Sequence, residues 1–262
     1  MRSGKPAAAF AVLLVVSFAT MNAMPSDTLL AAMLQEAVLA LVALVAVRFA
    51  VPDVLKRCTQ AVQQRNTVRF AAIALLLTGL IGGAVTLLTW LFADGGNVSG
   101  FVSAALPLAA GLIRNLLLLL GICLLTGVYE EAFMRVLGIE AFERALDTKR
   151  AILASAALFA LLHVGAPDVS AGQLVLLQTA LKFGQALLFG VILGALYART
   201  RRLWPCAFIH AGFDILYMAP NVLLTGTMPE TYASGAVGDT VLLAVSVLML
   251  SGIVLKICKE IA

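Results

Sequence analysis

Apolar segments long enough to cross a lipid bilayer recur along nearly the whole chain. A bilayer core about 30 Å thick needs about 20 helical residues at 1.5 Å rise each. We expect eight such spans, at residues 7–24, 29–51, 70–93, 113–137, 151–164, 174–198, 203–218 and 241–257. Because 62% of the residues are hydrophobic and only 12% are charged, a soluble fold could not bury this surface. The sequence therefore predicts an all-α polytopic membrane protein, a bundle of about eight transmembrane helices around a buried polar chamber, with residues 1–262 as a single membrane domain.

Lys and Arg residues cluster in alternate connections between these segments. They precede the first span, follow the second, fourth and sixth, and close the eighth, whereas residues 24–27, 94–99, 165–172 and 229–239 contain none. The positive-inside rule then places both termini in the cytoplasm. The net charge of +4 reflects this topology, so we expect membrane lipids as partners and no nucleic acid. Because the apolar spans use nearly all of the chain, we expect a multi-pass protein of a bacterial plasma membrane.

The first apolar segment also has features of a secretory signal peptide. Arg2 and Lys5 precede it, and small residues lie near its end. We expect it to be retained as a span, because the predicted topology accommodates it. Four scattered cysteines without C-x-x-C spacing indicate neither a disulfide framework nor a thiolate metal site.

Two adjacent carboxylates interrupt the fourth apolar segment. Glu131 and Arg135 are four residues apart, so they share a helix face and can form an ion pair that offsets part of the burial cost. Glu130 is rotated by about 100° from its neighbour and stays available as a general base. An ion pair that only fixes helix register is the alternative interpretation.

The two histidines of the chain also lie in apolar surroundings. His163 ends the fifth span, and His210 lies in the seventh with Asp214 four residues later on the same face. Counting from the nearest cytoplasmic Arg at 1.5 Å per residue places these groups and Glu130 roughly 12 to 21 Å deep, in one layer. Glu and His side chains that meet at one depth can activate a water molecule. Phe159, one turn before His163, is expected to be a packing residue.

Three motifs occur in order along the chain: Glu130-Glu131-x-x-x-Arg135, Phe159-x-x-x-His163 and His210-x-x-x-Asp214. Together they resemble the CPBP family of intramembrane peptidases, which comprises the CAAX prenyl proteases and bacteriocin-processing enzymes and is also called the Abi group. The resemblance covers about residues 125–217, and we expect the peptidase core at about residues 113–220.

The resemblance implies an intramembrane endopeptidase acting on membrane-bound or lipidated peptides. In such an enzyme Glu130 and His163 would activate the hydrolytic water, and His210 with residue 214 would stabilise the oxyanion. Glu131 and Arg135 would hold Glu130 in place. Many members carry Asn where this chain has Asp214, and an ionised Asp cannot donate to an oxyanion. Asp214 is then protonated, supports His210 or binds a metal.

The need for a metal and the functional class are both open to alternatives. Glu130, His163, His210 and Asp214 would form a reasonable zinc set, but they lack the compact spacing of H-E-x-x-H, so we favour a mechanism without zinc or another divalent metal. An ion- or proton-coupled transporter could use the same buried groups, with Lys182 and Glu36 as further support. A non-catalytic immunity or scaffold protein is the third possibility.

Overall fold

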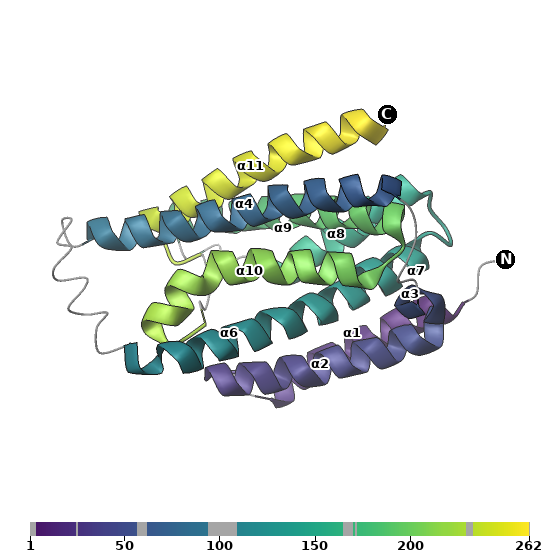
Figure 1. The fold of residues 1–262 in the computed structure, drawn as a ribbon, viewed down its shortest axis with the longest axis horizontal. Coiled ribbons are helices and arrows are strands. Elements are labelled where there is room, and N and C mark those ends of the chain that lie inside the picture. The colour runs from purple at the N-terminus through teal and green to yellow at the C-terminus, as the bar shows by residue number, and fades with distance from the viewer. Residues whose placement is uncertain are drawn as a thin grey trace.

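The computed structural model describes residues 4–24, 26–56, 62–93, 109–164, 170, 172–228 and 233–261. Within these residues the chain is almost entirely helical and contains no β-strand. The long helices run side by side as a bundle (Figure 1). In chain order the elements are α1 (Lys5–Ala23), α2 (Leu29–Ala50), α3 (Pro52–Lys56), α4 (Val62–Ala93), α6 (Ala109–Glu130), the π-helix η2 (Glu131–Ile139), α7 (Glu140–Phe142), α8 (Thr148–Val164), α9 (Gln173–Thr200), α10 (Leu203–Thr225) and α11 (Val237–Ile261).

Seven of the described helical segments are long and apolar enough to cross a membrane. They are Lys5–Ala23, Leu29–Ala50, Asn66–Phe92, Gly111–Phe142, Gln173–Thr200, Leu203–Thr225 and Val237–Lys256. The remaining predicted span corresponds to α8, whose 17 residues pack against α9 and η2. The predicted class, an all-α polytopic membrane protein, is confirmed.

The seventh predicted span was too short. It was expected to end at residue 218, but α10 continues to Thr225 and has Pro220 inside it. Membrane helices tolerate an internal proline because neighbouring groups satisfy the freed backbone carbonyl. The helix ends instead where Gly226 adopts a left-handed conformation with φ 72°, which glycine reaches without steric cost.

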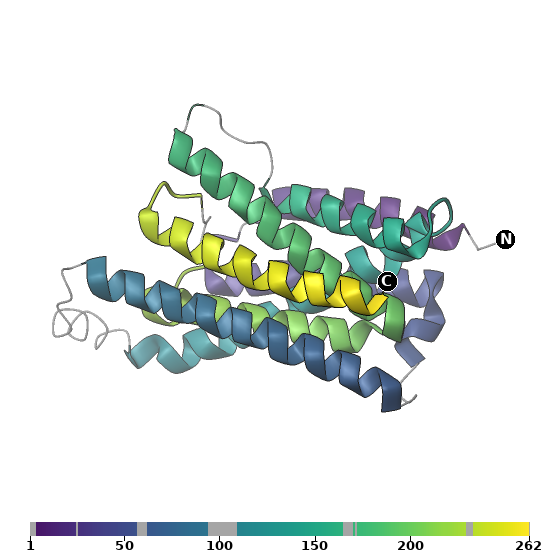
Figure 2. The same cartoon turned by 90° about the horizontal axis from the view of Figure 1, so that it is seen from above.

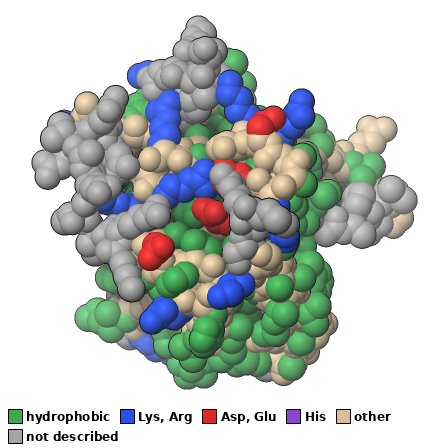
Figure 3. Space-filling model, turned by 90° about the vertical axis from the view of Figure 1, so that its right-hand side faces the viewer, with side chains coloured by type: hydrophobic (Ala, Val, Ile, Leu, Met, Phe, Trp, Pro, Cys, Tyr) green, Lys and Arg blue, Asp and Glu red, His purple; other side chains and the backbone are tan. Residues whose placement is uncertain are grey.

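One end of the bundle carries both termini and a gathering of Lys and Arg side chains. The start of α1, the end of α11 and the α9–α10 connection all lie there (Figure 1). Figure 3 shows the basic side chains on this end. This is the charge pattern from which the cytoplasmic location of the termini was inferred, and that location stays a prediction.

At this end of the bundle, an ionic network links the α7–α8 connection to the α9–α10 connection. Arg201 adopts the left-handed backbone conformation, with φ 50°. Its Nη1 atom lies 2.8 Å from Glu140 Oε1, and its Nη2 atom lies 2.7 Å from Glu143 Oε1. Thr148 donates to Glu143, and Tyr197 donates to Glu140. The hydrogen bonds with Glu143, reinforced by the charges of both carboxylates, hold the pKa of Arg201 above its ordinary value. The α7–α8 connection is thereby tied to the end of α9.

The centre of the bundle is a rare π-helical segment. All nine residues of η2 are buried, and it packs against α1, α2, α8, α9 and α10. A regular α-helix was expected here, but the backbone changes to the wider π form at Glu131. Such insertions often mark functional sites, because they redirect side chains. The acidic pair lies at this change of backbone.

Close backbone packing sets the position of α10. A Cβ on Gly79 would lie 2.7 Å from the carbonyl oxygen of Phe213, and one on Gly127 would lie 2.6 Å from that of Ala207. Only glycine permits α4 and α6 to approach α10 this closely. His210 and Asp214 are therefore held at a fixed distance from the acidic pair.

Candidate active site

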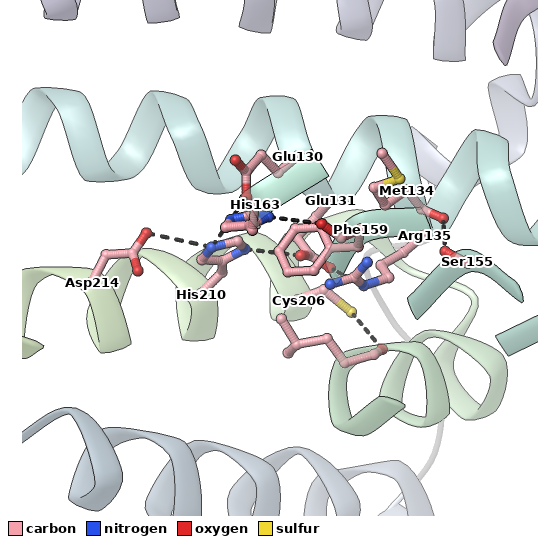
Figure 4. Close-up of polar contacts among 11 residues, drawn as sticks. Glu130, Glu131, Met134, Arg135, Ser155, Phe159, His163, Cys206, His210 and Asp214 are labelled. Atoms are coloured by element: carbon pink, nitrogen blue, oxygen red, sulfur yellow. Dashed lines mark hydrogen bonds and ion pairs between the residues drawn. The ribbon is translucent and has the colours of Figure 1, made fainter. Parts of the chain in front are cut away.

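All six residues predicted for the site come together in the middle of the bundle (Figure 4). Glu130 ends α6, and Glu131 and Arg135 belong to η2. His163 comes from α8, and the remaining two, His210 and Asp214, come from α10. Three separate stretches of the chain, the α6–η2 junction, α8 and α10, thus supply one cluster of polar groups.

His210 lies at the centre of this cluster, with carboxylates on both sides of its ring. Its Nδ1 is 2.8 Å from Glu131 Oε1, and its Nε2 is 3.3 Å from Asp214 Oδ2 and 3.5 Å from Glu130 Oε2. Only the imidazolium form can donate from both ring nitrogens. The edge-to-face contact with Phe189, with ring centroids 4.8 Å apart, fixes the ring plane.

Glu131 and Arg135 form the predicted ion pair, with Arg135 Nε 3.2 Å from Glu131 Oε2. Both side chains are almost fully buried. The Arg135 guanidinium also lies over the ring of Phe159, 4.5 Å from its centroid. The pair was expected to hold Glu130. In the structure Glu131 contacts His210, and Arg135 contacts the ring of Phe159. Whether the pair positions Glu130 as well stays a prediction.

His163 faces Glu130 with one nitrogen and its own helix with the other. Nδ1 lies 2.9 Å from the carbonyl oxygen of Phe159, which can only accept, so Nδ1 carries the proton. Nε2 lies 4.0 Å from Glu130 Oε2. In the neutral ring Nε2 therefore presents a lone pair toward a carboxylate oxygen.

Two aromatic residues at the site were not assigned to it from the sequence. Phe159 is buried in the core, as expected, but its ring also packs against the His163 ring in a tilted arrangement, with centroids 4.1 Å apart. Its position one helical turn before His163 was the sequence feature that could have indicated this contact. Phe189 packs on His210, and nothing in the apolar run of residues 174–198 distinguishes it from its neighbours.

A cavity of about 350 Å³, lined by residues of α1 and α8, reaches Glu130 and His163. Residues of α1, including Ser17 and Phe18, form one wall, and Leu162 of α8 lies on the other. Phe18 and Leu162 are exposed at the rim. The first apolar segment, as α1, thus forms one wall of the cavity, and its retention stays a prediction.

The four potential metal ligands match the geometry of a bound ion only in part, because His210 Nε2 lies 3.3 Å from Asp214 Oδ2 and 3.5 Å from Glu130 Oε2 but His163 lies farther from Glu130. A tetrahedral ion with bonds of 2.0 to 2.1 Å holds its ligand atoms roughly 3.4 Å apart, whereas Glu130 Oε2 and His163 Nε2 are separated by 4.0 Å. Among the residues that the structure describes, no group of three or more His, Cys, Asp or Glu side chains is arranged to hold a metal.

The fold and the site define a polytopic membrane protein with a buried centre of Glu and His side chains. Residues 112–216, which include all six predicted site residues, match the model of the family described as type II CAAX prenyl endopeptidase Rce1-like. This match confirms the resemblance inferred from the motifs. No curated protein matches the chain significantly.

Proposed function

We propose that this protein hydrolyses peptide bonds within the membrane, using Glu130 and His163 to activate water. The observation that carries the proposal is the 4.0 Å separation of Glu130 Oε2 and His163 Nε2, two acceptor atoms directed into one space. The separation is too long for a direct hydrogen bond. A water molecule about 2.8 Å from each atom would span it at an angle of about 90°, close to the angle between its own O–H bonds.

In the first step Glu130 takes a proton from this water while His163 Nε2 accepts its second O–H. The water oxygen attacks the carbonyl carbon of the peptide, and the electron pair of the C=O π bond moves onto the oxygen. In the second step the C–N bond breaks, and Glu130 returns the proton to the departing amine. General-base catalysis of this kind contributes about 10²- to 10⁴-fold to rate.

His210 is placed to stabilise the oxyanion formed in the first step. Its Nε2 lies 3.5 Å from Glu130 Oε2, so it faces the space in which the water is activated. Glu131 accepts from Nδ1 and keeps the imidazolium oriented. The contact between Asp214 and Nε2 favours the supporting role among the three considered for Asp214, because a carboxylate beside the ring stabilises its positive charge.

The cavity suits a peptide that arrives from the bilayer. Its rim is apolar, and its inner end is formed by Glu130 and His163. A lipidated or membrane-anchored segment could enter between α1 and α8 without leaving the hydrocarbon. We accordingly propose a membrane-bound or lipidated peptide as substrate, in a multi-pass protein with both termini in the cytoplasm of a bacterial cell.

Cleavage by purified protein in proteoliposomes tests the proposal. The substrates are a panel of membrane-anchored peptides, including a prenylated peptide with a CAAX terminus. We expect Glu130→Gln and His163→Gln to lower turnover at least 100-fold, while Glu140→Gln, a carboxylate outside the site, retains it. Wild-type rates in the two site variants would overturn the mechanism. Ion flux without cleavage, abolished by the same substitutions, would instead establish a transporter.

A further inference from the structure

A second cavity, of about 270 Å³, lies among α4, α9 and α11 at the end of the bundle that carries both termini. Asn66 and Thr67 line it near the start of α4, Arg199 near the end of α9 and Lys256 near the end of α11. The α11 helix packs along α4 and α9 (Figures 1 and 2). The cavity near Glu130 is lined by other elements, α1, α6, η2 and α8.

The two charged residues among the described lining of this second cavity are both basic. Arg199 and Lys256 line it, and none of its described lining residues is an Asp or Glu. An anion bound in the cavity would interact favourably with both positive charges. The Lys256 ammonium lies over the ring of Phe70, 4.4 Å from its centroid, which holds it at the cavity.

The remaining lining groups divide into polar donors and an apolar wall. The Asn66 amide and the Thr67 hydroxyl can each donate a hydrogen bond to an oxygen anion. Phe70, Ile192 and Leu196 provide an apolar surface beside them. The cavity therefore combines donors for an anion with a surface for hydrocarbon, as an amphipathic ligand requires.

We propose that this cavity binds the phosphate headgroup of an anionic phospholipid. Arg199 and Lys256 contact the phosphate, Asn66 and Thr67 donate to its oxygens, and an acyl chain lies along Phe70 and Leu196. Basic pockets between transmembrane helices on the cytoplasmic side are suited to such headgroups. The bound lipid bridges α4, α9 and α11, and so stabilises the bundle away from the catalytic centre.

Thermal unfolding of the full-length protein in detergent tests this site. Phosphatidylglycerol is titrated against phosphatidylcholine, and inorganic phosphate serves as a third arm. We expect phosphatidylglycerol to raise the Tm of the wild type, whereas the other two additives leave it unchanged. Arg199→Gln and Lys256→Gln should each weaken the apparent affinity about fivefold. Both side chains are exposed, so these variants should fold.

A matched control and a second variant make the outcome decisive. Arg150→Gln removes an exposed Arg of α8 that is paired with Asp147 and is not among the described lining residues of the cavity, so it should retain the full lipid response. Asn66→Leu keeps both charges and removes one donor, so it should weaken the response without changing the Tm in phosphatidylcholine. An undiminished phosphatidylglycerol response in the Arg199→Gln/Lys256→Gln double variant would overturn the site. A phosphate response equal to that of the lipid would overturn the choice of ligand.

Discussion

His210 Nδ1 lies 2.8 Å from Glu131 Oε1, so the carboxylate next to the proposed general base orients the imidazole on α10. The same carboxylate is paired with Arg135 through its other oxygen. Glu131 thus connects a buried guanidinium to the ring that faces the reacting groups. The two adjacent glutamates therefore face different surroundings: Glu130 lines the cavity, whereas Glu131 contacts His210 and Arg135.

Replacing Glu131 alone should destabilise the protein more than replacing both Glu131 and Arg135. Glu131→Gln leaves the Arg135 charge buried without a counter-charge, which costs about 3 to 5 kcal/mol. Arg135→Met leaves a carboxylate that still contacts His210. We expect the double variant to be more stable than the sum of the single changes implies, as measured by thermal unfolding in detergent. Additive losses would show that the two side chains do not interact.

Replacing Asp214 separates the roles considered for it. Asp214→Asn keeps the shape and removes the charge beside His210, so we expect kcat/KM to fall by about tenfold through weaker stabilisation of the imidazolium. Asp214→Leu removes the polar contact as well and should cost more. The measurement is cleavage of a fluorogenic membrane peptide. A loss in Asp214→Asn as large as that in Glu130→Gln would assign Asp214 to the chemical step itself.

The absence of a metal requirement is a separate prediction. If Glu130 and His163 activate water directly, incubation with a strong chelator leaves kcat unchanged, and added Zn²⁺ does not raise it. Metal analysis of the purified protein accompanies the assay. Loss of activity on chelation, with recovery on adding back one ion, would contradict the mechanism and would make Glu130, His163, His210 and Asp214 the first residues to test as ligands.

Much of the site could be predicted because its groups are rare in their surroundings. Charged and imidazole side chains in apolar segments are costly, so Glu130, His163 and His210 stand out, and equal depth brings them together. The partners that come from distant segments could not be assigned this way. The hydrogen bond between Glu131 and His210 joins residues 79 positions apart in sequence, and Phe189 is one apolar residue among many.

The backbone conformation around the site also could not be predicted from the spacing of apolar residues. Apolar residues fill the segment from 113 to 137 on all sides, so their spacing does not separate α from π geometry. The π-helix η2 depends on tertiary packing against the surrounding helices. Similarly, the continuation of α10 through Pro220 depends on neighbours that make up for the missing N–H donor.

Filling the cavity at Ser17 should block substrate entry without touching the chemical groups. The Ser17 side chain is buried, donates to the carbonyl oxygen of Leu13 and lines the cavity between α1 and α8. In Ser17→Leu a larger apolar side chain occupies this space, so we expect KM to rise by tenfold or more with a smaller change in kcat. Ser17→Ala removes only the hydroxyl and serves as the control with near wild-type kinetics. If Ser17→Leu cleaved the peptide with an unchanged KM, the substrate would reach Glu130 by a route other than this cavity.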